Sequence, residues 1–129
     1  MTIYFITMAG LVFLVSAIYA QSALSELLDF FRNSPSLLEK TGFISDLYFL
    51  YDLTRCRYGF VRYLFKHPVP PKEIADAFPD YSRLRNISNV VYGLHVVFGI
   101  VLIAAFVIHQ CKCVTINANL RNELINWDR

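Results

Sequence analysis

Two apolar stretches dominate the pattern of hydrophobic and polar positions along this chain. Residues 3–23 and 90–108 each run about twenty positions without an aspartate, glutamate, lysine or arginine. A helix rises about 1.5 Å per residue, so each stretch is long enough to cross the roughly 30 Å hydrocarbon core of a bilayer. The pattern therefore predicts an all-α membrane protein with two transmembrane helices, joined by a helical, amphipathic, membrane-proximal loop of about sixty residues.

The first stretch is predicted to be a signal anchor rather than a cleaved signal peptide. No basic residue precedes it, and its apolar run exceeds the usual h-region of about 7–15 residues. A soluble core around both stretches is disfavoured, because 129 residues that are 56% hydrophobic leave too little polar surface to cover it. We predict four segments: 1–33, the first transmembrane helix with an amphipathic cytoplasmic extension; 34–80, the helical loop with a proline-rich connector at 67–71; 81–110, the second transmembrane helix; and 111–129, a short polar C-terminal tail.

The distribution of basic residues predicts the orientation of the chain. The net charge is only +2, so no strong global field selects nucleic acid or an acidic partner. The basic residues between the two apolar stretches are Arg32, Lys40, Arg55, Arg57, Arg62, Lys66, Lys72, Arg83 and Arg85, whereas none precedes the first stretch. By the positive-inside rule, the loop is expected in the cytoplasm and both termini outside.

The segment 44–65 crowds aromatic residues among arginines. Placed on one helix, at about 100° per residue, its apolar residues fall on two opposite sides. One side carries Leu47, Tyr51, Tyr58, Val61 and Phe65, and the other carries Phe49, Leu53, Cys56, Phe60 and Tyr63. The sequence therefore predicts a two-faced helix that needs two neighbours.

Lipid headgroups and a protein are the two neighbours that this composition suggests, because tyrosine and arginine are at home at the headgroup boundary. The residues assigned to the lipid interface are Arg55, Arg57, Arg62 and, in the tail, Trp127. The residues assigned to a protein partner are Phe49, Leu53, Phe60 and Tyr63. Packing of this second face on residues 27–31 and 74–78 of the same chain stays open as the alternative.

Catalytic motifs are absent as far as spacing can show. The sequence has no glycine-rich phosphate loop, no HExxH, no GxSxG and no paired cysteine and histidine cluster, so we predict no enzyme, no metal site and no cofactor. His95 and His109 lie fourteen positions apart, which places both rings near one face of a helix. A bis-histidine haem site between two copies of the chain is therefore kept as an alternative.

An apolar N-terminal anchor runs into a leucine-rich extension, followed by Phe-Arg-Asn-Ser-Pro-Ser-Leu-Leu at 31–38 and a Gly-Phe step at 42–43. A tyrosine- and arginine-rich stretch and a second apolar span complete the layout. This arrangement resembles universal stress protein B, a family of small bacterial inner-membrane proteins, although the proline-rich connector and the tail depart from it. The resemblance implies a bacterial inner membrane and a stress-linked, non-enzymatic role, and it carries over no site residue.

Surplus apolar surface without catalytic motifs leads to two hypotheses about function. In the first, the chain is an accessory or structural subunit that packs on the periphery of a larger integral membrane protein complex. In the second, it is a free-standing stress-response protein that forms a small homo-oligomer and interacts with the lipid bilayer. The tail beyond residue 114 is either a short helix anchored by Trp127 at the outer interface or a loosely ordered segment.

Overall fold

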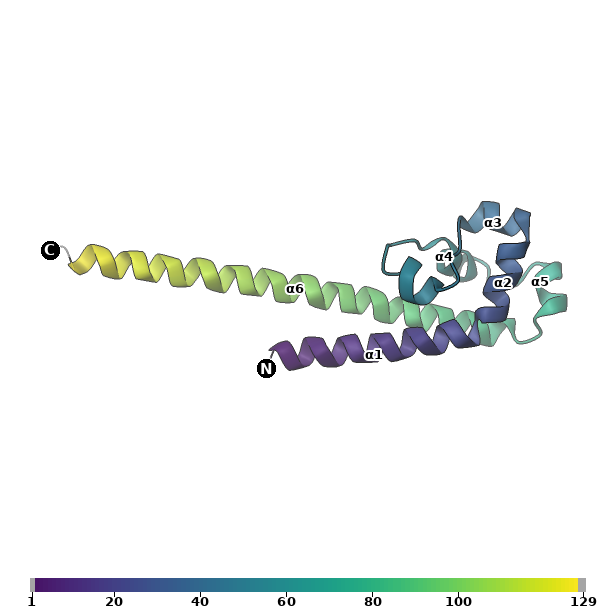
Figure 1. Ribbon diagram of the computed structural model, residues 1–129, viewed down its shortest axis with the longest axis horizontal. Helices are drawn as coiled ribbons and strands as arrows, with labels where there is room; N and C mark the ends of the chain where they lie inside the picture. The colour runs from purple at the N-terminus through teal and green to yellow at the C-terminus, as the bar shows by residue number, and fades with distance from the viewer. Residues whose placement is uncertain (1, 128–129) are drawn as a thin grey trace.

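The computed structural model describes the backbone of residues 2–127 and the side chains of residues 3–112 and 114–116. Its elements are helical and no strand occurs within residues 2–127, which confirms the predicted all-helical class. In chain order they are α1 (Thr2–Ala23), α2 (Ser25–Asn33), α3 (Pro35–Thr41), η1 (Tyr48–Asp52), α4 (Gly59–Lys66), α5 (Lys72–Ala77) and α6 (Tyr81–Trp127). Figure 1 shows α1 and α6 side by side, with the short helices gathered at one end of the pair. We call residues 24–80 the head.

Helices α1 and α6 are each long and apolar enough to cross a membrane. The 22 residues of α1 rise about 33 Å, close to the thickness of a hydrocarbon core. Large apolar side chains stay more than half exposed along both helices, among them Leu11, Ile18, Ile100 and Phe106. A core helix of a soluble protein would bury most of these side chains, so this surface requires another cover.

Helix α6 continues past the residue at which the sequence predicted the second helix to end. It has 47 residues and is about 70 Å long, whereas the prediction ended this helix at residue 110 and made 111–129 a separate tail. No glycine or proline lies between positions 110 and 127. Because the residues that usually end a helix are missing there, helical hydrogen bonding continues, and α6 extends well beyond the N-terminal end of α1 (Figure 1).

The head has its own core, built mainly from aromatic and leucine side chains. Phe31 of α2 packs edge-to-face on Phe60 and Tyr63 of α4, with ring centres 5.1 and 5.3 Å apart. The fully buried side chains include Leu24, Leu27, Leu28, Phe31, Ile44, Tyr48, Phe49, Leu53, Phe60, Leu64 and Ile74. The short helices therefore fold around one another and onto the ends of α1 and α6, instead of lying as separate amphipathic segments.

The single two-faced helix predicted over 44–65 is wrong. The chain forms the π-helical turn η1, then a loop, and only then α4. Phe49 and Phe60 have ring centres 6.3 Å apart, whereas eleven residues of a continuous helix would separate them by about 16 Å along the axis. The chain therefore reverses between these two residues and brings their rings together.

Two side-chain hydrogen bonds compete with a continuous helix here. The bond of Tyr48 spans the reversal, and that of Asp52 ties the end of η1 to the segment before it. The Tyr48 hydroxyl donates to the backbone carbonyl of Arg57 at 2.6 Å, and the Asp52 carboxylate accepts from the Ser45 amide at 2.8 Å. Within the loop, Cys56 adopts a left-handed backbone conformation with φ of 59°. Bonds of this kind offer the backbone an alternative to the helical ladder, and they turn the chain back toward η1.

Gly59, the first residue of α4, lies against the backbone of Thr41. A Cβ atom built on Gly59 would overlap the carbonyl oxygen of Thr41, which is backbone and cannot swing aside. Only glycine therefore lets α4 approach the end of α3 at this distance. By contrast, a Cβ on Gly93 of α6 would meet nothing within 4 Å.

We predict that Gly59→Ala lowers the free energy of unfolding of the head by about 2 kcal/mol, because relieving the overlap moves α4 away from α3. Gly93→Ala is the matched control, and it should leave stability unchanged or slightly raise it, since alanine favours a helix interior. Denaturant titrations of the purified full chain in mild detergent, followed by circular dichroism, compare the two. Equal stabilities of the two variants would contradict the packing described here.

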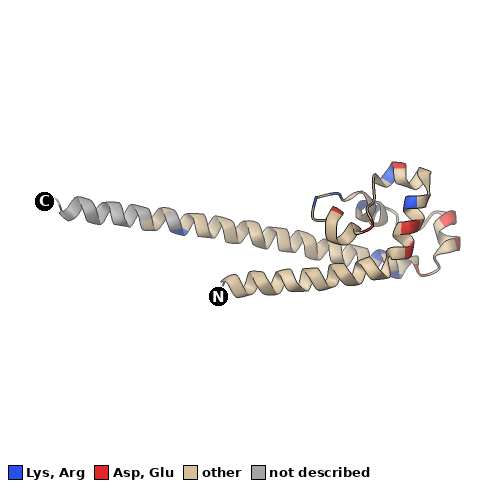
Figure 2. Ribbon diagram, viewed as in Figure 1, with Lys and Arg blue, Asp and Glu red and all other residues tan. Residues whose placement is uncertain are grey.

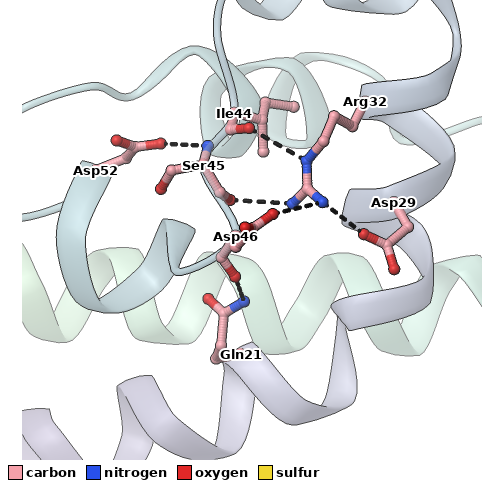
Figure 3. Close-up of polar contacts among 7 residues, drawn as sticks. All are labelled: Gln21, Asp29, Arg32, Ile44, Ser45, Asp46 and Asp52. Atoms are coloured by element: carbon pink, nitrogen blue, oxygen red, sulfur yellow. Dashed lines mark hydrogen bonds and ion pairs between the residues drawn. The ribbon is translucent and has the colours of Figure 1, made fainter.

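The guanidinium of Arg32 joins α2 to the segment that leads into η1 (Figure 3). Its Nε donates to the carbonyl of Ile44 at 3.3 Å, and a terminal nitrogen donates to the carbonyl of Ser45 at 3.1 Å. The other terminal nitrogen lies 2.8 Å from the carboxylates of both Asp29 and Asp46. One side chain thus engages two backbone carbonyls and two carboxylates, which the planar fork of arginine allows and the ammonium of lysine does not.

Gln21 ties the same segment to the last turns of α1. Its side-chain amide nitrogen donates to the carbonyl of Asp46 at 2.7 Å, and its oxygen accepts from the backbone amide of Phe49 at 3.0 Å. Both ends of one amide are therefore used to seat the start of η1 on α1, and Figure 3 shows the bond to Asp46. Arg32 and Gln21 together fix where the head begins relative to the long helices.

Replacing Arg32 by alanine should lower the free energy of unfolding by about 2–3 kcal/mol, because the two carbonyls lose a charged donor. Arg32→Lys should recover only part of that loss, since an ammonium cannot reproduce the fork. Arg62→Ala, an exposed arginine of α4, should stay within about 0.5 kcal/mol of the parent. The same denaturant titration measures all three, and full recovery by lysine would show that charge alone matters.

Candidate functional site

Two arginines of the loop after η1, the two exposed rings that they lie over, and the exposed Leu47 form a set of exposed side chains on the head. We call this set, Phe43, Leu47, Tyr51, Arg55 and Arg57, the arginine–aromatic rim. The guanidinium carbon of Arg55 lies 4.2 Å from the ring centre of Tyr51, and that of Arg57 lies 6.0 Å from the ring centre of Phe43. The apolar side chains of Phe43, Leu47 and Tyr51 are 69%, 54% and 46% exposed. The rim therefore presents apolar surface and positive charge side by side.

The position of Arg57 in the rim is set by the buried carboxylate of Asp52. This carboxylate is fully buried, and one of its oxygens lies 3.8 Å from a terminal nitrogen of Arg57. The backbone amide of Arg57 donates to the carbonyl of Asp52 at 3.0 Å. Arg57 is therefore both a surface cation and the ion-pair partner of a buried carboxylate, whereas the side chain of Arg55, within the described residues, stacks on Tyr51.

The rim lies beside the first turns of the apolar run of α6. Tyr58, one residue after Arg57, has its hydroxyl oxygen 3.2 Å from Nε2 of His95, and its ring packs edge-to-face on Tyr92 at 5.3 Å. His95 is five residues, or about 7 Å, into the apolar run that begins at Val90. The head thus reaches along α6 to the start of its most apolar part, and Figure 2 shows a basic stretch of loop at that edge.

Tyr58 also connects the rim to Cys56. A hydrogen bond to the Cys56 thiol, together with burial, raises the pKa of Tyr58 to about 12. The Tyr58 side chain also holds the loop against α6, through its contacts with His95 and Tyr92. Cys56 itself is an exposed free thiol between the two rim arginines, which makes it a natural position for a reporter group.

The four side chains predicted to bind a protein partner lie instead in the core of the head. Phe49, Leu53 and Phe60 are fully buried, and Tyr63 is 6% exposed. The prediction of a partner surface at these residues is corrected, because the chain reversal at the loop turns them inward onto α2. The alternative that the second face packs on residues 27–31 of the same chain is the one the structure supports, through the contacts of Phe31 with Phe60 and Tyr63.

The predicted lipid-interface residues divide into two groups. Arg55 and Arg57 come together in the rim, while Arg62 is exposed on α4 and none of its described contacts joins it to them. Trp127 is the last residue of α6, and its side chain lies outside the part of the chain that the structure describes. The structure therefore assembles two of these four residues.

His95 does not fit the haem alternative. Its Nε2, the atom that would bind iron, lies beside the Tyr58 hydroxyl, and its ring packs on Phe13 of α1 with ring centres 5.3 Å apart. His95 thus faces this chain's own head and α1, and not a second copy. Among the described residues, no three histidine, cysteine, aspartate or glutamate side chains group closely enough to hold a metal ion.

Sequence reasoning missed two residues on which the rim depends. Phe43 was recognised only as part of a Gly-Phe step, and its place follows from Gly42, whose φ of 78° ends α3 and turns the chain toward the rim. Nothing near Asp52 in the sequence indicates that this acid is buried. A lone acid within an aromatic run was the one available signal.

No family model, no curated protein and no solved structure matches this chain.

Proposed function

We propose that this chain is a non-catalytic integral membrane protein, inserted through α1 and α6, whose head is seated on lipid headgroups by the arginine–aromatic rim. The position of the rim carries this proposal. Because the head follows α6 to His95, insertion of the apolar run from Val90 onward brings the rim to the headgroup boundary. Exposed phenylalanine, leucine and tyrosine beside arginine suit that boundary. There the rings and alkyl stems are buried among the lipid chains while the guanidinium groups remain hydrated.

The direction of the head belongs to the same proposal. Nine of the twelve lysines and arginines lie between the two apolar stretches, and Figure 2 shows most charged residues on the head and on the adjoining ends of the long helices. By the positive-inside rule the head is then cytoplasmic, with the N-terminus and the far end of α6 outside. An anionic cytoplasmic leaflet attracts Arg55 and Arg57. A bacterial inner membrane and a stress-linked role stay predictions of the family resemblance.

A fluorophore on Cys56 tests the seating of the rim. In full-length protein with Cys111→Ser and Cys113→Ser, reconstituted into nanodiscs with nitroxide-labelled headgroups, we expect strong quenching at Cys56. Quenching should weaken with salt and with Arg55→Gln, because each arginine contributes about 1 kcal/mol to attraction by an anionic surface. Arg55 is preferred to Arg57 for this test, since Arg57 also pairs with the buried Asp52.

The matched control carries the label on α3, at Lys40→Cys with Cys56→Ser, because Lys40 is exposed and α3 lies on the side of the head away from the long helices (Figure 1). Quenching there should be weak and independent of salt. Equal quenching at the two positions, or quenching at Cys56 that ignores both salt and Arg55→Gln, would contradict a seated rim.

The far part of α6 favours a second candidate function, that of an accessory subunit of a larger membrane complex. Val114 and Ile116, which follow Lys112, are 68% and 58% exposed. They belong to the part of α6 that extends past the N-terminal end of α1 (Figure 1). Apolar side chains that project past the membrane boundary need a cover other than lipid. The partner surface then lies on α6, and not on the buried side chains that the sequence suggested.

For the accessory subunit, we expect native gels of mild detergent extracts to show the chain in a large stoichiometric complex. Ile116→Asp should release it, because a buried carboxylate without a partner is costly. Thr115→Asp, at the neighbouring polar position, should leave the complex intact. A band of monomer or small-oligomer size for the parent protein would exclude this candidate and leave the free-standing lipid-seated protein.

A further inference from the structure

The seam between α1 and α6 carries a groove on the face away from the rim. Two cavities of about 510 and 240 Å³ lie along it, each lined by both helices. Their α6 lining residues recur every three or four positions, at Arg83, Asn86, Val90, Leu94, Val97 and Val101. Those of α1 recur in the same way, at Phe5, Met8, Val12, Ser16 and Tyr19. This spacing defines one continuous stripe on each helix, so the two cavities are successive parts of one groove.

The two ends of the groove differ in chemistry. The cavity at the head end has Arg83 and Asn86 among its lining residues, with Tyr19 and Val90 beside them. The cavity further along is lined entirely by apolar residues, such as Met8, Val12, Leu94 and Val97. The groove therefore begins with a cation and a hydrogen-bond donor and continues as hydrocarbon.

Arg83 is a cation without an ion-pair partner within the part of the chain that the structure describes. Its side chain is exposed and makes no ion pair or side-chain hydrogen bond there. Arg85, two positions later, instead donates to the carbonyls of Leu64 and Phe65 at 2.8 and 3.2 Å. The two positions differ by roughly 200° around the helix, so one arginine supports the head and the other stays at the mouth of the groove.

The dimensions of the groove match one leaflet of a bilayer. From Arg83 to Val97 the helix rises about 21 Å, which spans a headgroup and the roughly 15 Å half-thickness of the hydrocarbon core. A ligand that fills the groove must therefore be anionic at one end and apolar over the rest. Basic pockets between transmembrane helices on the cytoplasmic side bind acidic lipid headgroups in this way.

We propose that the α1–α6 groove is a binding site for one glycerophospholipid, with its phosphate at Arg83 and Asn86 and an acyl chain along Val90, Leu94 and Val97. The site rests on the proposed insertion of α1 and α6 into a membrane, but it is separate from the rim. The rim meets many headgroups by charge and apolar contact, whereas the groove holds a single lipid that remains with the protein when the bilayer is removed.

The test titrates a phosphatidylglycerol into the purified, delipidated full chain in mild neutral detergent and counts bound lipids by native mass spectrometry. We expect one lipid per chain at saturation. Arg83→Gln should weaken its affinity about fivefold, and the side chain makes no described contact whose loss would unfold the protein. Val97→Trp should weaken it similarly by filling the apolar part, and Val97 is 57% exposed, so the larger ring is tolerated.

Three controls distinguish a lipid held in the groove from a lipid or an anion attracted to any basic surface. Lys40→Gln, which removes the same charge from α3, should not change the affinity. A diacylglycerol without the phosphate should bind about fivefold more weakly than phosphatidylglycerol, and excess inorganic phosphate should not displace the lipid. The proposal would be overturned if Arg83→Gln or Val97→Trp left the affinity unchanged, or if inorganic phosphate displaced the lipid completely. It would also be overturned if the parent protein were a dimer that Val97→Trp dissociates.

The same variants distinguish this site from the rim. Arg83→Gln should leave the quenching of a label on Cys56 unchanged, and Arg55→Gln should leave the number of bound lipids unchanged. If no lipid binds while the quenching at Cys56 is intact, the groove proposal alone is contradicted. If quenching at Cys56 is absent in every lipid while one lipid still binds, the proposed seating of the rim alone is contradicted.

Discussion

The guanidinium of Arg32 is the contact on which the arrangement of the head depends. It faces two backbone carbonyls of the segment 44–46 and two carboxylates, so it fixes a segment that has no helical hydrogen bonds of its own. From that segment the chain enters η1, which Gln21 seats on α1. The position of the rim follows, because Tyr51 is in η1 and Arg55 follows it by a few residues. By holding the backbone of the segment 44–46, the Arg32 guanidinium thus determines the position of the rim, which lies further along the chain.

The reversal between η1 and α4 determines which apolar residues become core and which stay outside. With the chain folded back at Cys56 and α4 allowed close to Thr41 by Gly59, Phe49 and Phe60 meet inside the head. What remains outside is the smaller set of the rim, with its arginines stacked on rings. The aromatic excess of the segment 44–65 therefore serves two purposes, a core for a small head and an exposed edge beside α6.

The elements that sequence could predict are those whose signal is local. The runs 3–23 and 90–108 are uncharged over a whole span, and the amphipathic turns of α2 end at a proline, so their helical nature was visible. The break at 53–58 was not, because it depends on the bond of Tyr48 across the reversal to Arg57 and on the bond of Asp52 back to Ser45. The misassigned partner face has a similar cause. A buried core and the interface of a permanent complex are similarly apolar, and only the path of the backbone tells them apart.

Helix α6 serves different neighbours on its different faces. Arg85, Tyr92 and His95 lie on the side that meets the head, while Arg83 and Val97 lie on the side that lines the groove with α1. Because the helix is rigid and continuous, the position of the head and that of the groove are fixed relative to each other. If α6 crosses a bilayer, the depth of its insertion sets the levels of the rim and of Arg83 together, because Arg83 lies about 18 Å before His95 along the same helix. The two arginines near the start of α6 then define both the depth of the head and the polar end of the groove.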